Sequence, residues 1–199
     1  MGIIIIEHKF YNERRILNES SFFDAVSESV RISQQKWIEW QHEMKGIIHC
    51  GPCLALHECW FVFGNEPIAP LHDKCHCTTV AIPTSQVKMH AKATSDYSKY
   101  DPYLFNTWGI HLHGKDKLFE SWGYSVEDAH WLQEEIERQG RANYLSGNYT
   151  LGKLNLFGQR LNIRVEIPRK DGHGIVSFIT GWTARPHGEI KLNTPYGGS

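Results

Sequence analysis

The sequence of 199 residues has no hydrophobic run long enough to cross a bilayer. Its densest apolar stretch, IIII at 3–6, is far too short for a span and is followed at once by the acidic Glu7. The stretch also lacks the basic flank and the small-residue cleavage site of a signal peptide. We therefore expect a buried strand at 3–6 and a chain that folds in the cytoplasm, with specialised export or injection left open.

An excess of charge of either sign is also missing. Lys and Arg number 21 and Asp and Glu number 22, which gives a formal net charge of −1. A net charge close to zero indicates neither a nucleic acid nor a membrane as partner, although a protein with this net charge can still have a local basic face. The hydrophobic content of 41% excludes a disordered chain.

Cysteine is scarce and odd in number, which argues against a disulfide framework. Four of the five cysteines fall in two short runs, HCGPC at 49–53 and PLHDKCHC at 70–77, with C-x-x-C and C-x-C spacings. A thiolate metal site needs two such ligand pairs, each on a tight turn, so that four donors converge on a structural zinc. The predicted ligands are these four cysteines, with one histidine as substitute: Cys50, Cys53, Cys75 and Cys77, and His72.

Two alternatives to zinc stay open for this segment. C-G-P-C is a redox tetrapeptide, but no hydrophobic strand of a thioredoxin unit precedes it and a redox pair needs no second cysteine cluster. Buried free thiols without metal are the other alternative. Cys59, in ECWFVF, is expected to be a small core residue. A closed four-ligand site has no open position for water, so it would stabilise the fold rather than catalyse.

Three regions separate by pattern and together predict an α+β chain. Residues 1–83 form an N-terminal helical region with the zinc-binding Cys/His segment, and an amphipathic helix is predicted at 20–44. Residues 84–100 are polar and turn-forming, so we expect a linker there. Residues 101–199 form a second α+β domain, a helix followed by an antiparallel sheet. The apolar positions of the 20–44 helix are Phe23, Val26, Val30, Trp37, Trp40 and Met44.

The second domain opens with a helix and continues with strands. Ser125 and Asp128 form a capping-box pattern, and Gly140 is expected to end the helix at its C′ position. In QRLNIRVEI, at 159–167, aliphatic and polar residues alternate as in a strand with one buried face. Asp171-Gly172 signals a hairpin after it. The helix face and the remaining strands of the meander are Ala129, Leu132 and Ile136, then 174–182 and 189–194.

The cysteine segment resembles the one that ends head-morphogenesis (minor head) domains of the phage Mu F type. There a C-x-x-C pair and a spacer precede a run that usually reads P-x-H-P-x-C-R-C, where this chain has Asp73 and His76 in place of Pro and Arg. This chain also lacks most of the long helical region that precedes the motif in capsid proteins. The same segment occurs in polymorphic and contact-dependent inhibition toxins, upstream of a variable C-terminal effector.

Residues 97–198 resemble one such toxin effector domain. The motifs are YSKYDPYLFN, then H-G-K-x-K-x-F-x-x-W-G-Y, GQRLNIRVEI and TPYGG. The resemblance implies a ribonuclease of the barnase/EndoU/colicin/RelE-like fold that acts in the cytoplasm, delivered from another cell or carried by a phage particle. It implies RNA, and tRNA in particular, as substrate. It also implies a cognate immunity protein whose acidic surface covers the basic face.

Metal-free RNA cleavage needs a base for the ribose 2′-OH, cations for the phosphate and an acid for the leaving oxygen. HLHGKDK, at 111–117, brings two histidines and two lysines together, with His113 expected as base or acid. Arg160 and Arg164 project from one strand face, with Asn162 between them, and suit phosphate recognition. The full set of predicted catalytic residues is His113, Lys115, Lys117, Arg160, Arg164, Thr194 and Tyr196, with His111 beside them.

The charge distribution agrees with an RNA-binding function, but each of the features that suggest this function also has an ordinary structural interpretation. Basic residues concentrate in 150–199 while the helix at 126–139 is acidic, as expected of an RNA-binding sheet with a solvated rear. Alternating arginines are nevertheless often a plain solvent face. Four tryptophans are expected in the core rather than as base-stacking platforms. These are Trp108, Trp122, Trp131 and Trp182.

Two classes of function follow. The first is a toxin-type endoribonuclease with a structural zinc. The second is a non-enzymatic phage or prophage minor head protein whose cysteine segment joins a capsid or portal assembly. A redox protein built on CGPC is a third hypothesis.

Overall fold

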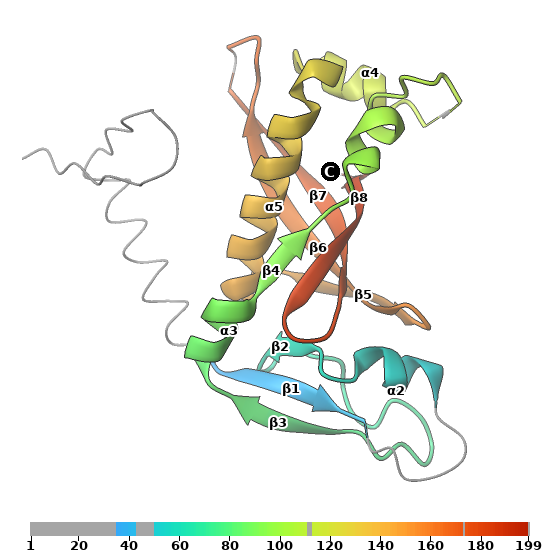
Figure 1. The fold of residues 1–199 in the computed structure, drawn as a ribbon, viewed down its shortest axis with the longest axis vertical. Coiled ribbons are helices and arrows are strands. Elements are labelled where there is room, and N and C mark those ends of the chain that lie inside the picture. The colour runs from blue at the N-terminus through green and yellow to red at the C-terminus, as the bar shows by residue number, and fades with distance from the viewer. Residues whose placement is uncertain (1–34, 43–49, 111–112, 173, 199) are drawn as a thin grey trace, which may run out of the picture. The chain divides into compact units, whose positions relative to one another are not determined.

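The computed structural model describes residues 35–42, 50–110, 113–172 and 174–198. The expected strand at 3–6 and residues 20–34 of the expected helix lie outside this part of the chain. Residues from Lys36 onward belong to one compact unit. Within it the described elements form two sheets with helices, so an α+β architecture is confirmed (Figure 1).

The larger sheet has five strands in the order β4-β8-β7-β6-β5. Four of them form an antiparallel meander, as the alternating pattern predicts, and β4 adds to β8 in parallel. The strands are β4 (Lys92–Thr94), β5 (Thr150–Asn155), β6 (Gly158–Pro168), β7 (Ile175–Ala184) and β8 (Glu189–Gly198). On β6 the aliphatic side chains of Leu161, Ile163, Val165 and Ile167 are all buried. The opposite face of β6 therefore carries the polar residues.

Helix α5 (Ala129–Leu145) packs against β6 through the apolar stripe expected from its spacing. The capping box of Ser125 and Asp128 is present at its start, across a short 3-10 turn at Val126–Asp128. Gly140 does not end the helix, and that expectation is wrong. It is buried mid-helix, where an added Cβ would lie 2.5 Å from the Trp182 ring, so glycine lets helix and sheet approach.

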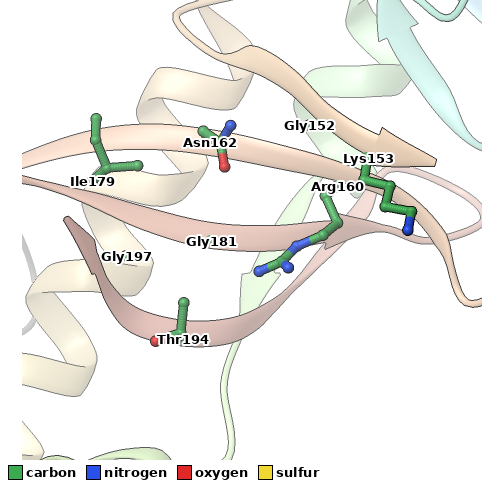
Figure 2. Close-up of a pocket in the computed structure, with 8 residues that line it drawn as sticks. All are labelled: Gly152, Lys153, Arg160, Asn162, Ile179, Gly181, Thr194 and Gly197. Carbon is green, nitrogen blue, oxygen red and sulfur yellow. The ribbon is translucent and has the colours of Figure 1, made fainter. Parts of the chain in front are cut away.

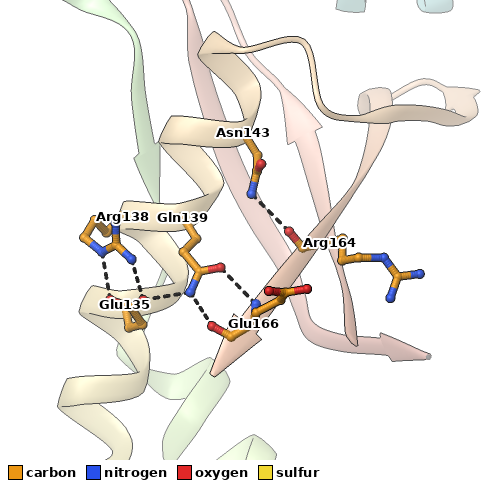
Figure 3. Close-up of polar contacts among 6 residues, drawn as sticks. All are labelled: Glu135, Arg138, Gln139, Asn143, Arg164 and Glu166. Atoms are coloured by element: carbon orange, nitrogen blue, oxygen red, sulfur yellow. Dashed lines mark hydrogen bonds and ion pairs between the residues drawn. The ribbon is translucent and has the colours of Figure 1, made fainter. Parts of the chain in front are cut away.

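Two side chains of α5 bond to the backbone of β6 beyond the end of its pairing with β5 (Figure 3). The Gln139 amide accepts from the Glu166 N–H at 2.9 Å and donates to the Glu166 carbonyl. Asn143 donates to the Arg164 carbonyl at 3.0 Å. These amides provide hydrogen bonds that a neighbouring strand would otherwise make.

The smaller sheet, in the order β2-β1-β3, contradicts the predicted 20–44 helix where the two overlap. Its strands are β1 (Trp37–Gln41), β2 (Trp60–Val62) and β3 (Thr78–Ile82). The indoles of Trp37 and Trp40 are buried. Their spacing suits a helix, but β1 gains backbone partners on both sides from strands distant in sequence, and this outweighs local preference.

The expected linker at 84–100 is also structured. It contains helix α3 (Thr84–His90), strand β4 and a 3-10 turn at Tyr97–Lys99. Val87 is fully buried and β4 joins β8, so polar composition here reflects one exposed face rather than a free connection. Helix α4 (Lys115–Glu120) lies further along.

The cysteine segment is joined to the rest of this unit by buried polar contacts. The Tyr144 hydroxyl of α5 donates to the Trp60 carbonyl at 2.7 Å, and the Val62 N–H donates to the Tyr149 hydroxyl at 3.0 Å. Helix α2 (Gly51–Leu56) contacts β5 and β6. Among the described residues, no helix is long and apolar enough to span a membrane.

Candidate functional site

The face of the large sheet opposite the buried aliphatic row carries a cavity of about 310 Å³, lined by β5, β6, β7 and β8 (Figure 2). This is the lower end of the size range of small-molecule sites, about 300–1,000 Å³. The lining residues are Gly152, Lys153, Arg160, Asn162, Ile179, Gly181, Thr194 and Gly197. No acidic residue is among those that the structure describes there.

Glycine keeps the centre of this cavity open. A Cβ atom at Gly181 would lie 3.0 Å from Thr194 Cγ2 and 3.2 Å from a terminal guanidinium nitrogen of Arg160. A side chain at this position would therefore occupy the space between the Arg160 and Thr194 side chains. Gly181 is an unstrained strand residue, so its role is the space that it leaves.

The cations of the cavity differ from most of the other basic residues of the sheet. Arg160 and Lys153 form no ion pair and no side-chain hydrogen bond with residues that the structure describes. Four other cations of the sheet and its connections are paired with carboxylates. They are Lys92 with Glu189, Arg169 with Asp171, Lys170 with Asp128 and Lys191 with Asp96. Arg160 and Lys153 therefore bring uncompensated positive charge to the cavity, the arrangement that an anion requires.

A third cation reaches the rim of the cavity from helix α4. Lys115 Nζ donates to Thr194 Oγ1 at 3.1 Å and to the Tyr103 hydroxyl at 2.9 Å, and it lies 4.9 Å from the Tyr103 ring centroid. These partners are neutral, so the ammonium keeps its full charge. Its hydroxyl and ring contacts fix the position of that charge beside Thr194.

His113 holds the backbone of the same lysine. Its Nδ1 accepts from the Lys115 N–H at 3.1 Å, and its Nε2 donates to the Tyr103 carbonyl at 2.8 Å. Both ring nitrogens are therefore engaged, which suits a neutral imidazole that positions Lys115. Proton transfer by His113, expected from the sequence, would require one of these bonds to break.

The remaining predicted catalytic residues that the structure describes do not line the cavity. Arg164 is exposed and donates to the Ser177 hydroxyl at 2.9 Å, and it is not part of the lining. Lys117 is exposed on α4. The Tyr196 ring packs against Phe178, with ring centroids 5.8 Å apart, and its carbonyl accepts from Thr194 Oγ1 at 2.8 Å. His111 lies outside the described residues.

The predicted zinc ligands come together around Cys53. Its sulfur lies 3.2 Å from His72 Nε2 and 3.7 Å from the Cys75 sulfur. Its donor atom also lies within 4.8 Å of those of Cys50 and His72, and within 4.8 Å of those of His42 and Cys77. In a tetrahedron with bonds of ~2.3 Å, sulfur ligands are about 3.8 Å apart. The cluster can thus hold a metal ion.

Groups around the cluster also fit a metal. His72 Nδ1 donates to the Asp73 carbonyl at 2.6 Å, which leaves Nε2, the nitrogen nearest Cys53, as the lone-pair donor. The indole N–H of Trp40 is buried without an ordinary hydrogen bond, and it acts to lower the pKa of the Cys77 thiol. A buried donor beside a sulfur is better satisfied by a thiolate than by a thiol.

The cysteine pKa values reflect burial and the crowding of the thiols. Burial and the neighbouring thiols raise the pKa of Cys53. Burial also raises the pKa of Cys77. At Cys75 burial acts upward, but backbone N–H groups of Cys77 and Leu71 outweigh it and lower the pKa to about 7. A bound cation would favour the thiolate at every one of these positions.

Cys59 lies in the core, as expected. It is fully buried, its thiol donates to the Ala55 carbonyl at 3.6 Å, and burial raises its pKa to about 12.

Sequence reasoning missed three residues of these two sites. His42 Nδ1 lies 3.6 Å from the Cys77 sulfur, and it was not predicted as a ligand because a helix was expected at this position. Lys153 lies on a strand that has no clear alternation and was not predicted. Tyr103 stands in the motif YSKYDPYLFN, which could have drawn attention to it as a hydroxyl near the histidine–lysine run.

Comparison with protein-family models, with curated proteins and with solved structures found no match to this chain.

Proposed function

We propose that this protein is an endoribonuclease that cleaves RNA without a catalytic metal, and that the sheet cavity binds the scissile phosphate. One observation carries this proposal, namely that two cations without carboxylate partners, Arg160 and Lys153, line one open cavity in which the described residues include no acidic side chain. Arg160 and Lys153 would hold the non-bridging phosphate oxygens, and the Thr194 hydroxyl and Asn162 amide lie on the same surface.

Cleavage by transesterification requires a defined exchange of bonds. The ribose 2′-oxygen bonds to phosphorus as the bond from phosphorus to the 5′-oxygen breaks, which yields a 2′,3′-cyclic phosphate and a 5′-hydroxyl. The 2′-oxygen passes its proton to solvent water, and the 5′-oxygen gains one from a protein group. Negative charge increases on the phosphoryl oxygens in the transition state, where Arg160 and Lys153 stabilise it.

Lys115 is the residue that we assign to the leaving oxygen. Its ammonium is placed beside Thr194 by Tyr103, and its backbone is held by His113. An ammonium at this rim can donate the proton that the 5′-oxygen needs. His113 and Tyr103 then act as positioning residues, a different role for His113 from the one expected from sequence.

The biological setting that we propose follows from the motif resemblance. It favours a polymorphic or contact-dependent inhibition toxin that acts in the cytoplasm on tRNA, with an immunity protein that covers the cationic cavity. The metal of the cysteine cluster would be zinc. Its ligands would come from His42, Cys50, Cys53, His72, Cys75 and Cys77. With four positions filled it would stabilise the fold and take no part in cleavage.

The test compares Arg160→Ala with its matched neighbour Arg164→Ala on the same strand face. Purified protein is incubated with total bacterial RNA, with and without a brief EDTA treatment, and the ends are mapped while circular dichroism checks folding. We expect EDTA-resistant cuts with cyclic phosphate ends, a loss of about 10²–10³-fold in rate for Arg160→Ala, and a loss of under 10-fold for Arg164→Ala.

Intact RNA from folded wild-type protein would overturn the nuclease proposal and favour the phage-assembly alternative. Equal losses for the two arginine variants would instead remove the cavity from the mechanism.

A further inference from the structure

Trp108 is an exception among the seven tryptophans of the chain. Four are buried, and two others stack on aromatic rings, Trp122 on Phe178 and Trp131 on Tyr124, each at 5.7 Å. Trp108 is 72% exposed and makes no ring contact or hydrogen bond with any residue that the structure describes. The expectation of a core position is therefore wrong for Trp108, and also for Trp131, which is 42% exposed but stacked.

The turn that presents Trp108 follows an anchored segment. Leu104 and Phe105 are buried, with Phe105 packed edge-on against Phe119 at 6.3 Å. A turn then closes with the Gly109 N–H donating to the Asn106 carbonyl at 2.8 Å. Trp108 lies at this turn, so a defined backbone presents its ring to solvent, with Ile110 also exposed.

The segment that leads into this turn contacts the rim of the anion cavity. Tyr103 accepts a hydrogen bond from Lys115, which also donates to Thr194. Trp108 is five residues from Tyr103, so their Cα atoms are at most about 18 Å apart. A strand of a few nucleotides can therefore reach from the cavity to the indole.

Two lysines near Tyr103 provide positive charge that suits a nucleic-acid strand. Lys99 Nζ lies 6.0 Å and Lys115 Nζ 4.9 Å from the centroid of the Tyr103 ring. Cations that follow a phosphate backbone, next to an exposed aromatic ring, are the combination that binds single-stranded nucleic acid. Bases of a duplex are stacked on each other and cannot take up such a ring.

We propose that Trp108 stacks on an unpaired base of the RNA whose phosphate occupies the Arg160 cavity, so that the substrate is single-stranded RNA or an unpaired loop. This inference rests on the proposed nuclease function, since it takes the cavity as the phosphate site. It assigns Trp108 a binding role and no part in proton transfer.

The test measures binding of a fluorescein-labelled 2′-O-methyl RNA oligomer, which lacks the attacking hydroxyl and is not cut, by fluorescence anisotropy. The full-length chain is used as wild type, Trp108→Ala, Trp108→Phe and the control Trp131→Ala, and the duplex of the same oligomer is a second ligand. We expect the single strand to bind more tightly than the duplex. Trp108→Ala should weaken single-strand binding about 5- to 100-fold. Trp108→Phe should keep most of the affinity, and Trp131→Ala should match wild type.

Arg160→Ala, measured in the same assay, separates the two proposals. Weaker binding by Arg160→Ala with unchanged binding by Trp108→Ala overturns the stacking inference and leaves the cavity intact as the phosphate site. Duplex bound as tightly as single strand overturns it as well. No binding of either ligand by folded wild-type protein overturns both the inference and the proposed function.

Discussion

The cysteine cluster and the sheet cavity are built in opposite ways. The cluster crowds groups that repel one another once ionised, and these groups can hold a cation among them. The cavity instead holds cations apart from carboxylates and leaves space between them. A closed cluster can stabilise, whereas an open cavity with unneutralised charge can bind and act. We therefore expect stability and activity to respond separately to substitutions in the two regions.

The largest expected effect on stability is that of Cys53→Ser, because Cys53 contributes to both groups of candidate ligands. Loss of the metal should lower the free energy of unfolding by several kcal/mol. Metal content by mass spectrometry and urea unfolding would measure this. Below the unfolding transition, RNA cleavage should persist, since the cavity is lined by β5–β8.

Cys59→Ala is the matched control for that experiment, since Cys59 is a buried cysteine outside the cluster. It should keep the metal. A Cys53→Ser protein that still copurifies with a full equivalent of metal would show that the cluster is not the binding site.

Gly181→Ala should have the reverse profile, with activity lost and stability kept. The added methyl group points between Thr194 Cγ2 and the Arg160 guanidinium, and a displacement of about 1 Å there can cost up to ~100-fold in rate. We expect a 10- to 100-fold lower cleavage rate with a free energy of unfolding within about 1 kcal/mol of wild type.

The double variant Gly181→Ala/Thr194→Ser sharpens this prediction, because serine keeps the hydroxyl and removes Cγ2. It should recover part of the lost rate. A single variant with the full wild-type rate would mean that the substrate does not enter this space.

Asp128→Asn should have the smallest effect and should leave cleavage unchanged, since Asp128 belongs to neither site. Its carboxylate accepts from the Ser125 N–H at 3.0 Å and from Lys170 at 2.8 Å. Burial acts to raise the pKa of this carboxyl, but the Lys170 and Ser125 bonds outweigh it and hold the pKa below its ordinary value. Its stabilising contribution is therefore present above about pH 4 and is lost as the pH falls through the lower folded-state pKa.

Urea unfolding at pH 7 and at pH 3 tests this, with the exposed Glu134→Gln as control. Asp128→Asn should cost about 1 kcal/mol at pH 7, and the difference from wild type should shrink at pH 3. An undiminished difference at pH 3 would assign the effect to packing and not to charge.

The parts predicted from sequence are those whose geometry is encoded within a few residues. The alternation in β6, the capping box at Ser125 and the two cysteine pairs depend on short spacing, and all three are found. Gly140 was expected to end the helix, and this was wrong. Glycine is needed at this position because the ring of Trp182, 42 residues further on, leaves no room for a Cβ atom. Strand β4 formed from polar residues because β8 offers it an edge.

The cavity illustrates the same limit within a single site. Arg160 and Thr194 could be predicted as site residues because each lies on a strand with alternating polar and apolar residues. Their proximity, however, depends on the register between β7 and β8, which shifts at Gly181. Arg164 has the same pattern as Arg160 and lies outside the lining. A periodicity of two identifies a face of a sheet, and strand pairing decides which part of that face is hollow.

The amides of Gln139 and Asn143 have a consequence for association between copies of this chain. An unpaired stretch of strand exposes N–H and carbonyl groups in the spacing that a second molecule's strand can match, which is a common route to fibrils and domain exchange. On β6 the helix already supplies these bonds at Glu166 and Arg164. Gln139 and Asn143 therefore protect the protein from self-polymerisation along this edge, at concentrations where an uncovered strand would aggregate.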